Sequence, residues 1–415
     1  MRLRSALSAL ALASLGALSQ ARADEAPTAI TIGHVHASSG TYAAISMPVY
    51  YGLKLWIDQV NADGGAFVKA YNKKIPIKLI SYDDQSNPAT EATLINQLIT
   101  QDHINMLVCD SGSVLTAPAV PIAREHKMFL FDPTGTGAPF FTSDNHYIAL
   151  LADPASTIWP RYAADFLNEE GGKYGIKTVA LLYSTNDFTG TQAAAFRKFI
   201  TEAGKLQIVY DQGVPTSTSN YTVLINNMAA KNPDAVIEMG YPGNDIAFLR
   251  NLQDAGQKFK FLFTIYSGSE PEEILKNVGV AGMKDVFTYV PGSSYPYKVT
   301  TGMDLEQYKA AWDKTYRSTP GANFGLNAVA GYTVGIVLQE TLANATSLSQ
   351  DALRDAVFGL SGKLTTLQGP FKLAPDGAQV GEITPLGQVE PEGKGVKLNV
   401  VYPPDLANSQ PVIGQ

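Results

Sequence analysis

The sequence has few of the residues that stabilise or catalyse through covalent or metal chemistry. Its 415 residues include one cysteine, Cys109, and five histidines. One cysteine cannot form a disulfide within the chain, so the core has to be stable without such cross-links. Cys109 ends an apolar run, a position more typical of a buried small hydrophobic side chain than of a reactive thiol.

Sequence motifs of common enzyme classes are also missing. The chain has no G-x-S-x-G elbow, no G-x4-G-K-[S/T] phosphate loop and no H-E-x-x-H zinc motif. The segment from Gly135 to Phe140 lacks the third glycine of G-x-G-x-x-G. His34 and His36 share one strand face, but a pair of ligands is too few for a closed metal site. We therefore expect a protein that is not an enzyme and that uses no cofactor and no metal.

Positive charge is in slight deficit. The chain has 31 Lys and Arg residues against 38 Asp and Glu residues, a net charge of −7. This balance argues against a nucleic-acid partner, and the acidic residues are spread along the chain in a way that favours solubility. No apolar run beyond the N-terminal region is long enough to cross a membrane.

The N-terminus has the pattern of an export signal. Arg2 and Arg4 precede an apolar stretch from Ala6 to Leu18, and Ala21-Arg-Ala23 is an A-x-A cleavage site. We expect residues 1–23 to be a signal peptide, with cleavage near Ala23 and a periplasmic mature chain. No cysteine lies near the cleavage site, which excludes a lipoprotein anchor.

Strand and helix patterns alternate along most of the chain, which predicts an α/β fold with parallel sheets covered by helices. Two successive series of this kind, followed by mixed elements, indicate two lobes. A first boundary is expected at Asp153-Pro154, because Asp-Pro favours a turn before a helix. The predicted strands are 29–35, 75–82, 105–110, 128–131, 178–183, 206–210, 235–239, 260–264 and 286–290, and the predicted helices are 48–60, 88–101, 114–126, 160–168, 192–203, 221–230, 245–255, 304–317 and 323–343.

Small hydroxyl and glycine residues follow two neighbouring predicted strands. Ser111-Gly112-Ser113 follows the strand at 105–110, and Thr134-Gly135-Thr136 follows the strand at 128–131. Ligands bind at the carboxyl ends of strands in α/β sheets, and hydroxyls with free N–H groups at a helix start suit a small carboxylate. The alternative is a plain helix cap in the first loop and a plain turn in the second.

Short motifs in a fixed order make the chain resemble the periplasmic leucine/isoleucine/valine-binding protein family, which serves ABC importers. The resemblance covers nearly all of the mature chain and implies the type I periplasmic binding fold, with two lobes, three hinge crossovers and a ligand in the cleft. It implies lobe 1 at 28–151 with 290–366, lobe 2 at 152–289 with 367–415, a membrane permease as partner, and a monomer. The motifs are Ile32-Gly33 with Ser39-Gly40, Asn61-Ala-Asp-Gly-Gly65, Tyr82-Asp-Asp84 with Asn87-Pro88, Thr116-Ala-Pro-Ala119, Pro133-Thr-Gly-Thr136 and Gln368-Gly-Pro-Phe371.

The resemblance also implies roles for individual residues. Ser113 matches the serine that grips the ligand carboxylate, and Thr134 and Thr136 match the second loop that binds the ligand head. Phe188 and Tyr241 match two cleft tyrosines of the second lobe. Ile45 stands where the family often has an aromatic residue, with Tyr42 close by.

One departure from the family bears on the ligand. Amino-acid binders of the family have an acidic residue after the strand at 260–264, where this chain has Tyr266 or Ser267, with Glu270 later. An unpaired ammonium in a closed cleft is costly, so an amine-free aromatic or aliphatic acid stands beside an amino acid as the expected ligand. An aromatic pocket with hydroxyl donors would include Tyr42, Phe188, Tyr241, Tyr266 and Tyr295.

The sequence leaves the biological role of binding open between two classes. A solute-binding protein would deliver the small carboxylate to an ABC importer. A periplasmic sensor would present the same bound molecule to a signalling receptor, and neighbouring permease and ATPase genes would separate the two.

Overall fold

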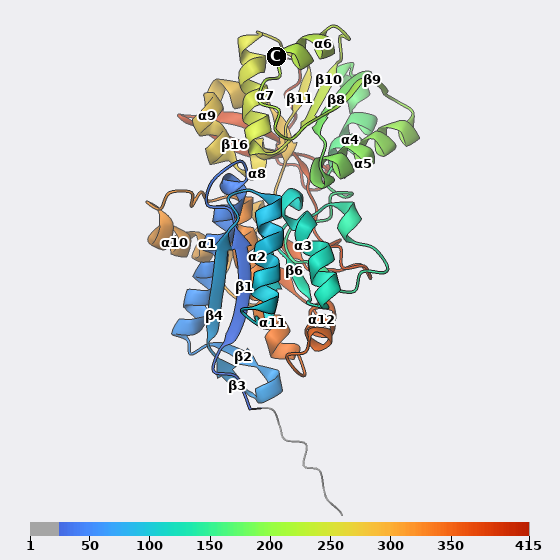
Figure 1. The fold of residues 1–415 in the computed structure, drawn as a ribbon. Helices are drawn as coiled ribbons and strands as arrows, with labels where there is room; N and C mark the ends of the chain where they lie inside the picture. Colours follow the sequence, from blue (N-terminus) through green and yellow to red (C-terminus); the bar gives the residue numbers. More distant parts are fainter. Residues whose placement is uncertain (1–24, 415) are drawn as a thin grey trace, which may run out of the picture.

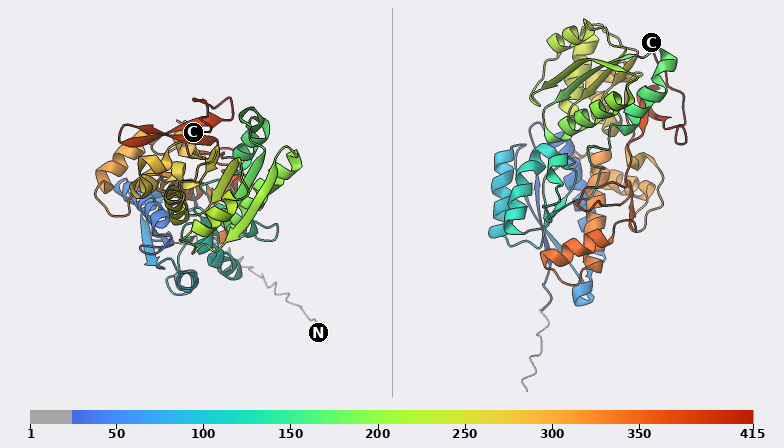
Figure 2. Two further views of the ribbon diagram at one scale, coloured as in Figure 1. Left: turned by 90° about the horizontal axis from the view of Figure 1, so that it is seen from above. Right: turned by 90° about the vertical axis from the view of Figure 1, so that its right-hand side faces the viewer.

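The computed structural model describes residues 25–414, so the predicted signal peptide lies outside the described residues. The chain folds into two lobes that stand one above the other, each built on its own β-sheet (Figures 1 and 2). Between residues 25 and 414, no helix combines the length and the apolar composition that a membrane crossing requires.

The first lobe has a parallel sheet in the order β4-β1-β5-β6-β7. Its strands place alternate side chains on opposite faces, because successive residues of a strand point in opposite directions. Met106 and Val108 join one core with α1, α11 and α12, whereas Leu107 joins a second core with α2 and α3. The elements of this lobe are β1 (Ile30–His36), α1 (Ala43–Ala62), β2 (Ala66–Val68), β3 (Lys73–Ile75), β4 (Ile77–Asp83), α2 (Pro88–Thr100), β5 (Met106–Val108), α3 (Ser113–His126), β6 (Leu130–Asp132), β7 (Ile148–Leu150), α10 (Leu305–Tyr316), α11 (Leu326–Asn344), α12 (Gln350–Gly359), β13 (Thr365–Thr366) and β14 (Gly369–Pro370).

The second lobe has a mixed sheet in the order β16-β15-β12-β11-β10-β8-β9, in which β15 pairs antiparallel with both β12 and β16 and the other pairs are parallel. Buried side chains from both faces of this sheet form one continuous core. Its elements are α4 (Arg161–Glu169), β8 (Thr178–Ser184), α5 (Asp187–Ala203), β9 (Gln207–Val214), α6 (Thr222–Ala229), β10 (Ala235–Met239), α7 (Pro242–Asp254), β11 (Phe261–Phe263), α8 (Tyr266–Ser269), α9 (Pro271–Met283), β12 (Phe287–Tyr289), β15 (Leu386–Glu392) and β16 (Gly395–Tyr402).

The chain passes between the lobes after β7, after β12 and before β15. The division of residues between the lobes stays a proposal, and packing favours one change in it. Phe371 and Leu373 belong to the core of α1 and α11, and the N–H of Leu150 donates to the carbonyl of Gly377 at 2.9 Å. We therefore propose that the third crossover follows Ala378, instead of preceding Leu367.

The predicted alternation of strands and helices is confirmed, and the differences are local. The helix expected to begin at Pro48 begins at Ala43, which places Ile45 and Ser46 on its buried face. The helix expected from 192 begins at Asp187, because the Asn186 side chain accepts hydrogen bonds from the N–H groups of Phe188 and Thr189. The sequence patterns missed the short elements β2, β3, β7, α8, β13 and β14 and the helices α9 and α12.

Candidate functional site

A narrow cavity lies between the lobes at the carboxyl ends of their strands. Both lobes and the first crossover contribute to its walls, as expected for a ligand site in an α/β protein. None of its lining side chains is cationic. The lining residues are Ile45, Gly112, Thr134, Asp153, Trp159, Phe188, Tyr241, Tyr266, Leu326 and Asn327.

Gly112 shapes the first-lobe wall. Its φ of 80° lies in the left-handed region, and a Cβ there would lie 2.9 Å from Cδ1 of Ile45 and 3.2 Å from the Tyr241 hydroxyl oxygen. Its N–H donates to Oγ1 of Thr134 at 2.9 Å, which ties the two predicted loops together. The glycine therefore allows a close approach between the loop and the opposite lobe.

The N-terminus of α3 points its free amides at the second lobe. The N–H groups of Ser113 and Val114 face the Tyr241 hydroxyl and partly offset the burial that raises the pKa of Tyr241 far above its ordinary value. The hydroxyl is buried and has no hydrogen-bond partner of good geometry. Amides of a first helical turn have no partner within the helix, so together with this hydroxyl they can bind a carboxylate.

The other predicted hydroxyls of these loops are buried but do not line the cavity. Oγ of Ser113 accepts from the N–H of Gly137 at 3.1 Å, and Oγ1 of Thr136 pairs with Oγ of Ser156 at 2.7 Å. The N–H of Gly135 donates to Asp132 at 2.7 Å. Ser111 has a buried hydroxyl without a partner. Direct ligand contact by these residues stays a prediction, since in the structure most of them brace the loops.

Aromatic rings form the second-lobe side of the site. Tyr241 lies edge-on to Tyr42 with ring centroids 5.1 Å apart, and Phe188 lies 5.5 Å from Tyr241. Trp159, which the sequence patterns missed, stands edge-on to Phe188 at 5.4 Å. Tyr266 lies 6.3 Å from Tyr241. The structure thus brings together Tyr42, Phe188, Tyr241 and Tyr266, which sequence reasoning grouped as one pocket.

Two other predicted contacts lie away from this lining. Oγ of Ser267 pairs with Oγ1 of Thr264 at 2.6 Å inside the second lobe. Tyr295 is half-buried in the loop after β12, with its ring 6.0 Å from that of Tyr297. Contact of Ser267 and Tyr295 with a ligand therefore remains a prediction that the cavity does not support.

Acidic groups at the cavity are a feature that the sequence analysis did not place. Asp153 follows the first strand series, has a φ of 69° and accepts a hydrogen bond from Nε2 of Gln368 at 2.6 Å. Burial raises the pKa of Asp153 to about 7. The only sequence signal was the Asp-Pro step, which indicated a boundary and not a binding group.

Glu270 contacts Asn327, a residue of the cavity lining, across the lobes. Its carboxylate accepts from the N–H of Asn327 at 3.2 Å and from Nδ2 of Asn327 at 2.6 Å. Asn327 lies in the first turn of α11, where a negative charge is favourable. Burial nevertheless raises the pKa of Glu270 to about 8.

Comparison with known proteins agrees with this architecture. A sequence model of the family described as periplasmic binding protein matches residues 29–394. The Leu/Ile/Val-binding protein homolog 7 of Brucella abortus is 22% identical over 412 residues, which cover 97% of this chain and 98% of the relative.

Solved structures of low sequence identity share the fold. One is a branched-chain amino acid transporter substrate binding protein from Streptococcus pneumoniae in complex with isoleucine, with a TM-score of 0.72, 20% identity and coverage of 90% of this chain and 100% of that one. Another is an ABC-transporter solute binding protein from R. palustris in complex with benzoate, with a TM-score of 0.71, 19% identity and coverage of 93% and 99%.

Proposed function

The chain belongs to the periplasmic binding protein family, and we propose that it is the extracytoplasmic solute-binding protein of an ABC importer. In this proposal it traps a small carboxylate between its lobes by hinge closure and delivers it to a membrane permease. The ligand is an amino acid or an amine-free aromatic or aliphatic acid. The relatives with isoleucine and with benzoate support both ligand classes equally.

The observation that carries the proposal is the meeting of two lobes over one buried, donor-rich point. The amides of Ser113 and Val114 come from the first lobe, and the unpartnered Tyr241 hydroxyl comes from the second. A carboxylate accepting from both would gain charge-assisted hydrogen bonds that form only when the lobes are close. A ligand with such extra contacts in the closed form stabilises that form.

The aromatic side of the cavity would hold the body of the ligand. Trp159, Phe188 and Tyr266 line the same cavity as Gly112 and Tyr241. A predominantly apolar lining with a few placed polar groups is typical of small-molecule sites. The donors would orient the ligand, and the rings would exclude water from it.

The first experiment is a thermal-shift screen of the mature protein against L-leucine, L-phenylalanine, benzoate and 3-phenylpropanoate, followed by calorimetric titration. A ligand at 100 times its Kd stabilises the protein by about 2.7 kcal/mol, which is readily detected. Small-angle scattering should show a smaller radius of gyration when the ligand is added. If every acid on the panel leaves both the melting temperature and the scattering unchanged, the proposal is wrong.

Tyr241→Phe tests the placement of the carboxylate. Loss of the hydroxyl should weaken binding of the best acid by roughly 10-fold, the effect of one hydrogen bond to a charged group. Tyr221→Phe is the matched control, because Tyr221 also has a buried hydroxyl without a partner but lies outside the cavity lining. Equal affinities of the two variants would place the carboxylate elsewhere.

A further inference from the structure

The crossover region holds a second cavity beside the first. It is also narrow, and it shares Asp153, Trp159 and Leu326 with the cavity between the lobes. Gln368 and Glu382 also line it. Asp153 therefore stands where the two spaces meet.

This meeting point has an excess of hydrogen-bond acceptors. Oε1 of Gln368 is buried and has no partner, while Nε2 of the same amide is already used by Asp153. The side chain of Glu382 is also buried, with a long hydrogen bond of 3.4 Å from Gln379 and with the N–H of Asp153 beside it. Neither cavity has a Lys, Arg or His side chain in its lining. Burying acceptors without donors costs free energy. A positively charged ligand group with several N–H donors would therefore complement this site.

We infer that Asp153 is the residue through which the site selects ligands that carry a cationic amino group. This inference rests on the proposed function and narrows its ligand class. An ammonium group has three donors and no acceptor, which complements the Asp153 carboxylate and the free Gln368 oxygen. The carboxylate of the same ligand would bind at the amides of α3, whose N-cap residue Gly112 lines the same cavity as Asp153.

The inference also accounts for the departure at Tyr266. The second lobe has a tyrosine where an acidic residue was expected, yet an acid reaches the cavity from the crossover instead. The Tyr266 ring lines the cavity, so the acid and the ring face one space. The charge partner of the ligand has therefore moved from the second-lobe sheet to the hinge.

Several other acidic groups interact electrostatically with Asp153. Burial is the main cause that raises the pKa values of Glu382, Glu270, Asp132 and Tyr266, and a charged Asp153 raises them further. Burial also raises the pKa of Asp153 itself and favours its protonated form when no cation is present. Binding of an ammonium ion should therefore release a proton near neutral pH.

The test uses two matched ligand pairs that differ only in the amino group. L-phenylalanine is compared with 3-phenylpropanoate, and L-leucine with 4-methylpentanoate, by calorimetry on the mature protein. We expect the wild type to bind at least one amino acid 10-fold or more tightly than its amine-free partner. In Asp153→Asn this ratio should fall at least 10-fold, while affinity for the amine-free acid stays the same or rises. Asp58→Asn removes an exposed charge on α1 and should leave the ratio unchanged.

The outcomes separate this inference from the proposed function. An unchanged ratio in Asp153→Asn would make Asp153 a protonated structural acid and overturn the inference. Tighter binding of the amine-free acids by the wild type would also overturn it, while leaving the proposed function intact. No binding of any of the four acids would contradict the proposed function itself.

A second measurement on the wild type keeps the inference testable if Asp153→Asn does not fold. Amino-acid affinity should rise between pH 6 and pH 8, and the binding heat should vary with the ionisation heat of the buffer because a proton is released. The amine-free acids should show neither effect. A pH-independent affinity with no proton release for the amino acids would contradict the role of Asp153.

Discussion

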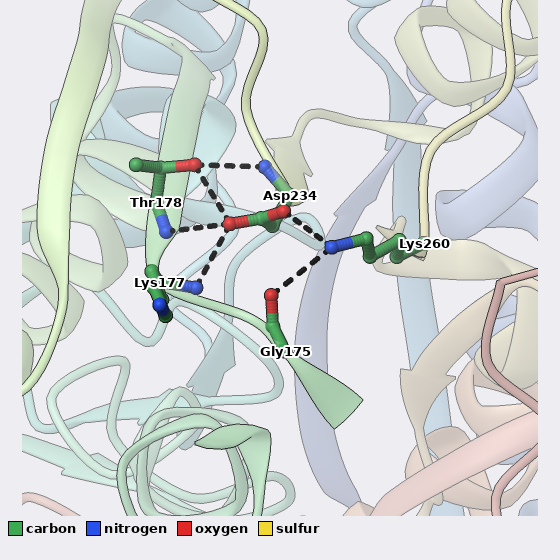
Figure 3. Close-up of polar contacts among 5 residues, drawn as sticks. All are labelled: Gly175, Lys177, Thr178, Asp234 and Lys260. Carbon is green, nitrogen blue, oxygen red and sulfur yellow. Dashed lines mark hydrogen bonds and ion pairs between the residues drawn. The ribbon is translucent and has the colours of Figure 1, made fainter. Parts of the chain in front are cut away.

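The amino edge of the second-lobe sheet and the first crossover at the cleft place an aspartate in opposite environments. Figure 3 shows Asp234 at the amino ends of β8, β10 and β11, where its carboxylate accepts from the N–H groups of Lys177 and Thr178 and from Nζ of Lys260 at 2.7 Å. Lys260 also donates to the carbonyl of Gly175 at 3.0 Å. At the cleft, Asp153 is more deeply buried and has one side-chain donor, Gln368.

The pKa values follow from the differences in burial and in donors. Hydrogen bonds from Lys260 and from the backbone, opposed by some desolvation, lower the pKa of Asp234 to about 2, whereas burial raises the pKa of Asp153 to about 7. At the amino edge of the sheet, donors of the protein itself bind the charged carboxylate of Asp234, so no ligand is needed there. The cleft edge leaves acceptors unsatisfied, a pattern more typical of a functional site than of a structural one.

The largest expected effect is on stability, from Asp234→Ala. The change removes a carboxylate that receives several charge-assisted hydrogen bonds, and we expect a loss of about 3 kcal/mol in the free energy of unfolding. Because the pKa is lowered in the folded state, this contribution is full above about pH 4 and is lost as the pH falls toward 2. Urea unfolding of the wild type and the variant at pH 7 measures the loss of stability, and the same comparison at pH 3 measures how much of it disappears in acid.

Asp211→Ala serves as the control for that change. Asp211 forms an exposed ion pair with Arg197, and such pairs contribute about 0–1 kcal/mol. Equal losses of unfolding free energy from Asp234→Ala and Asp211→Ala would show that Asp234 contributes no more than an exposed ion pair. The proposed contrast between Asp234 and Asp153 would then be wrong.

The second effect has the opposite sign and comes from Asp153→Asn. The raised pKa means that folded protein holds its proton more tightly than unfolded protein, so the wild type loses stability as the pH rises from about 4 to 7. We expect the free energy of unfolding of the variant to match that of the wild type near pH 4 and to exceed it by about 1–3 kcal/mol at pH 8 without ligand. The gain is smaller to the extent that the lobes open and water reaches the acid. Thermal unfolding measures the two proteins across this pH range, and a difference that does not change with pH would contradict the expectation.

The smallest effect concerns the movement of the lobes. Asn327→Ala removes the side-chain donor to Glu270, one of the hydrogen bonds between the lobes, and should favour the open form by about 1 kcal/mol. Small-angle scattering of the ligand-free protein should show a larger radius of gyration. Asn344→Ala, at the other end of α11, is the matched control and should leave scattering unchanged.

Much of the fold could be predicted because its signals are local. Apolar runs ending in turn residues marked most strands, and Asn87 and Pro88 marked the start of α2. Short elements such as β7 and β14 were missed since so few residues carry little periodic signal. Pro48 misled the prediction of α1, because a proline favoured in a first helical turn here lies within the helix.

The candidate site was predicted in part. Gly112, Thr134 and the cleft aromatics were found because they follow strands in sequence, and strand ends are where such sites lie. Trp159, Leu326 and Asn327 were missed because each lies in a segment with its own structural pattern and reaches the cavity only through the packing of distant elements.

The sequence by itself determined the α/β alternation, the family resemblance and the small hydroxyl and glycine loops, since each depends on neighbours along the chain. Only the tertiary structure decided which side chains share a space and what charge that space favours. Asp153 and Asp234 show the reason, because their residue type is the same and their pKa values move apart. The pKa of a carboxyl depends on donors and burial supplied by residues far away in sequence, such as Gln368 for Asp153 and Lys260 for Asp234.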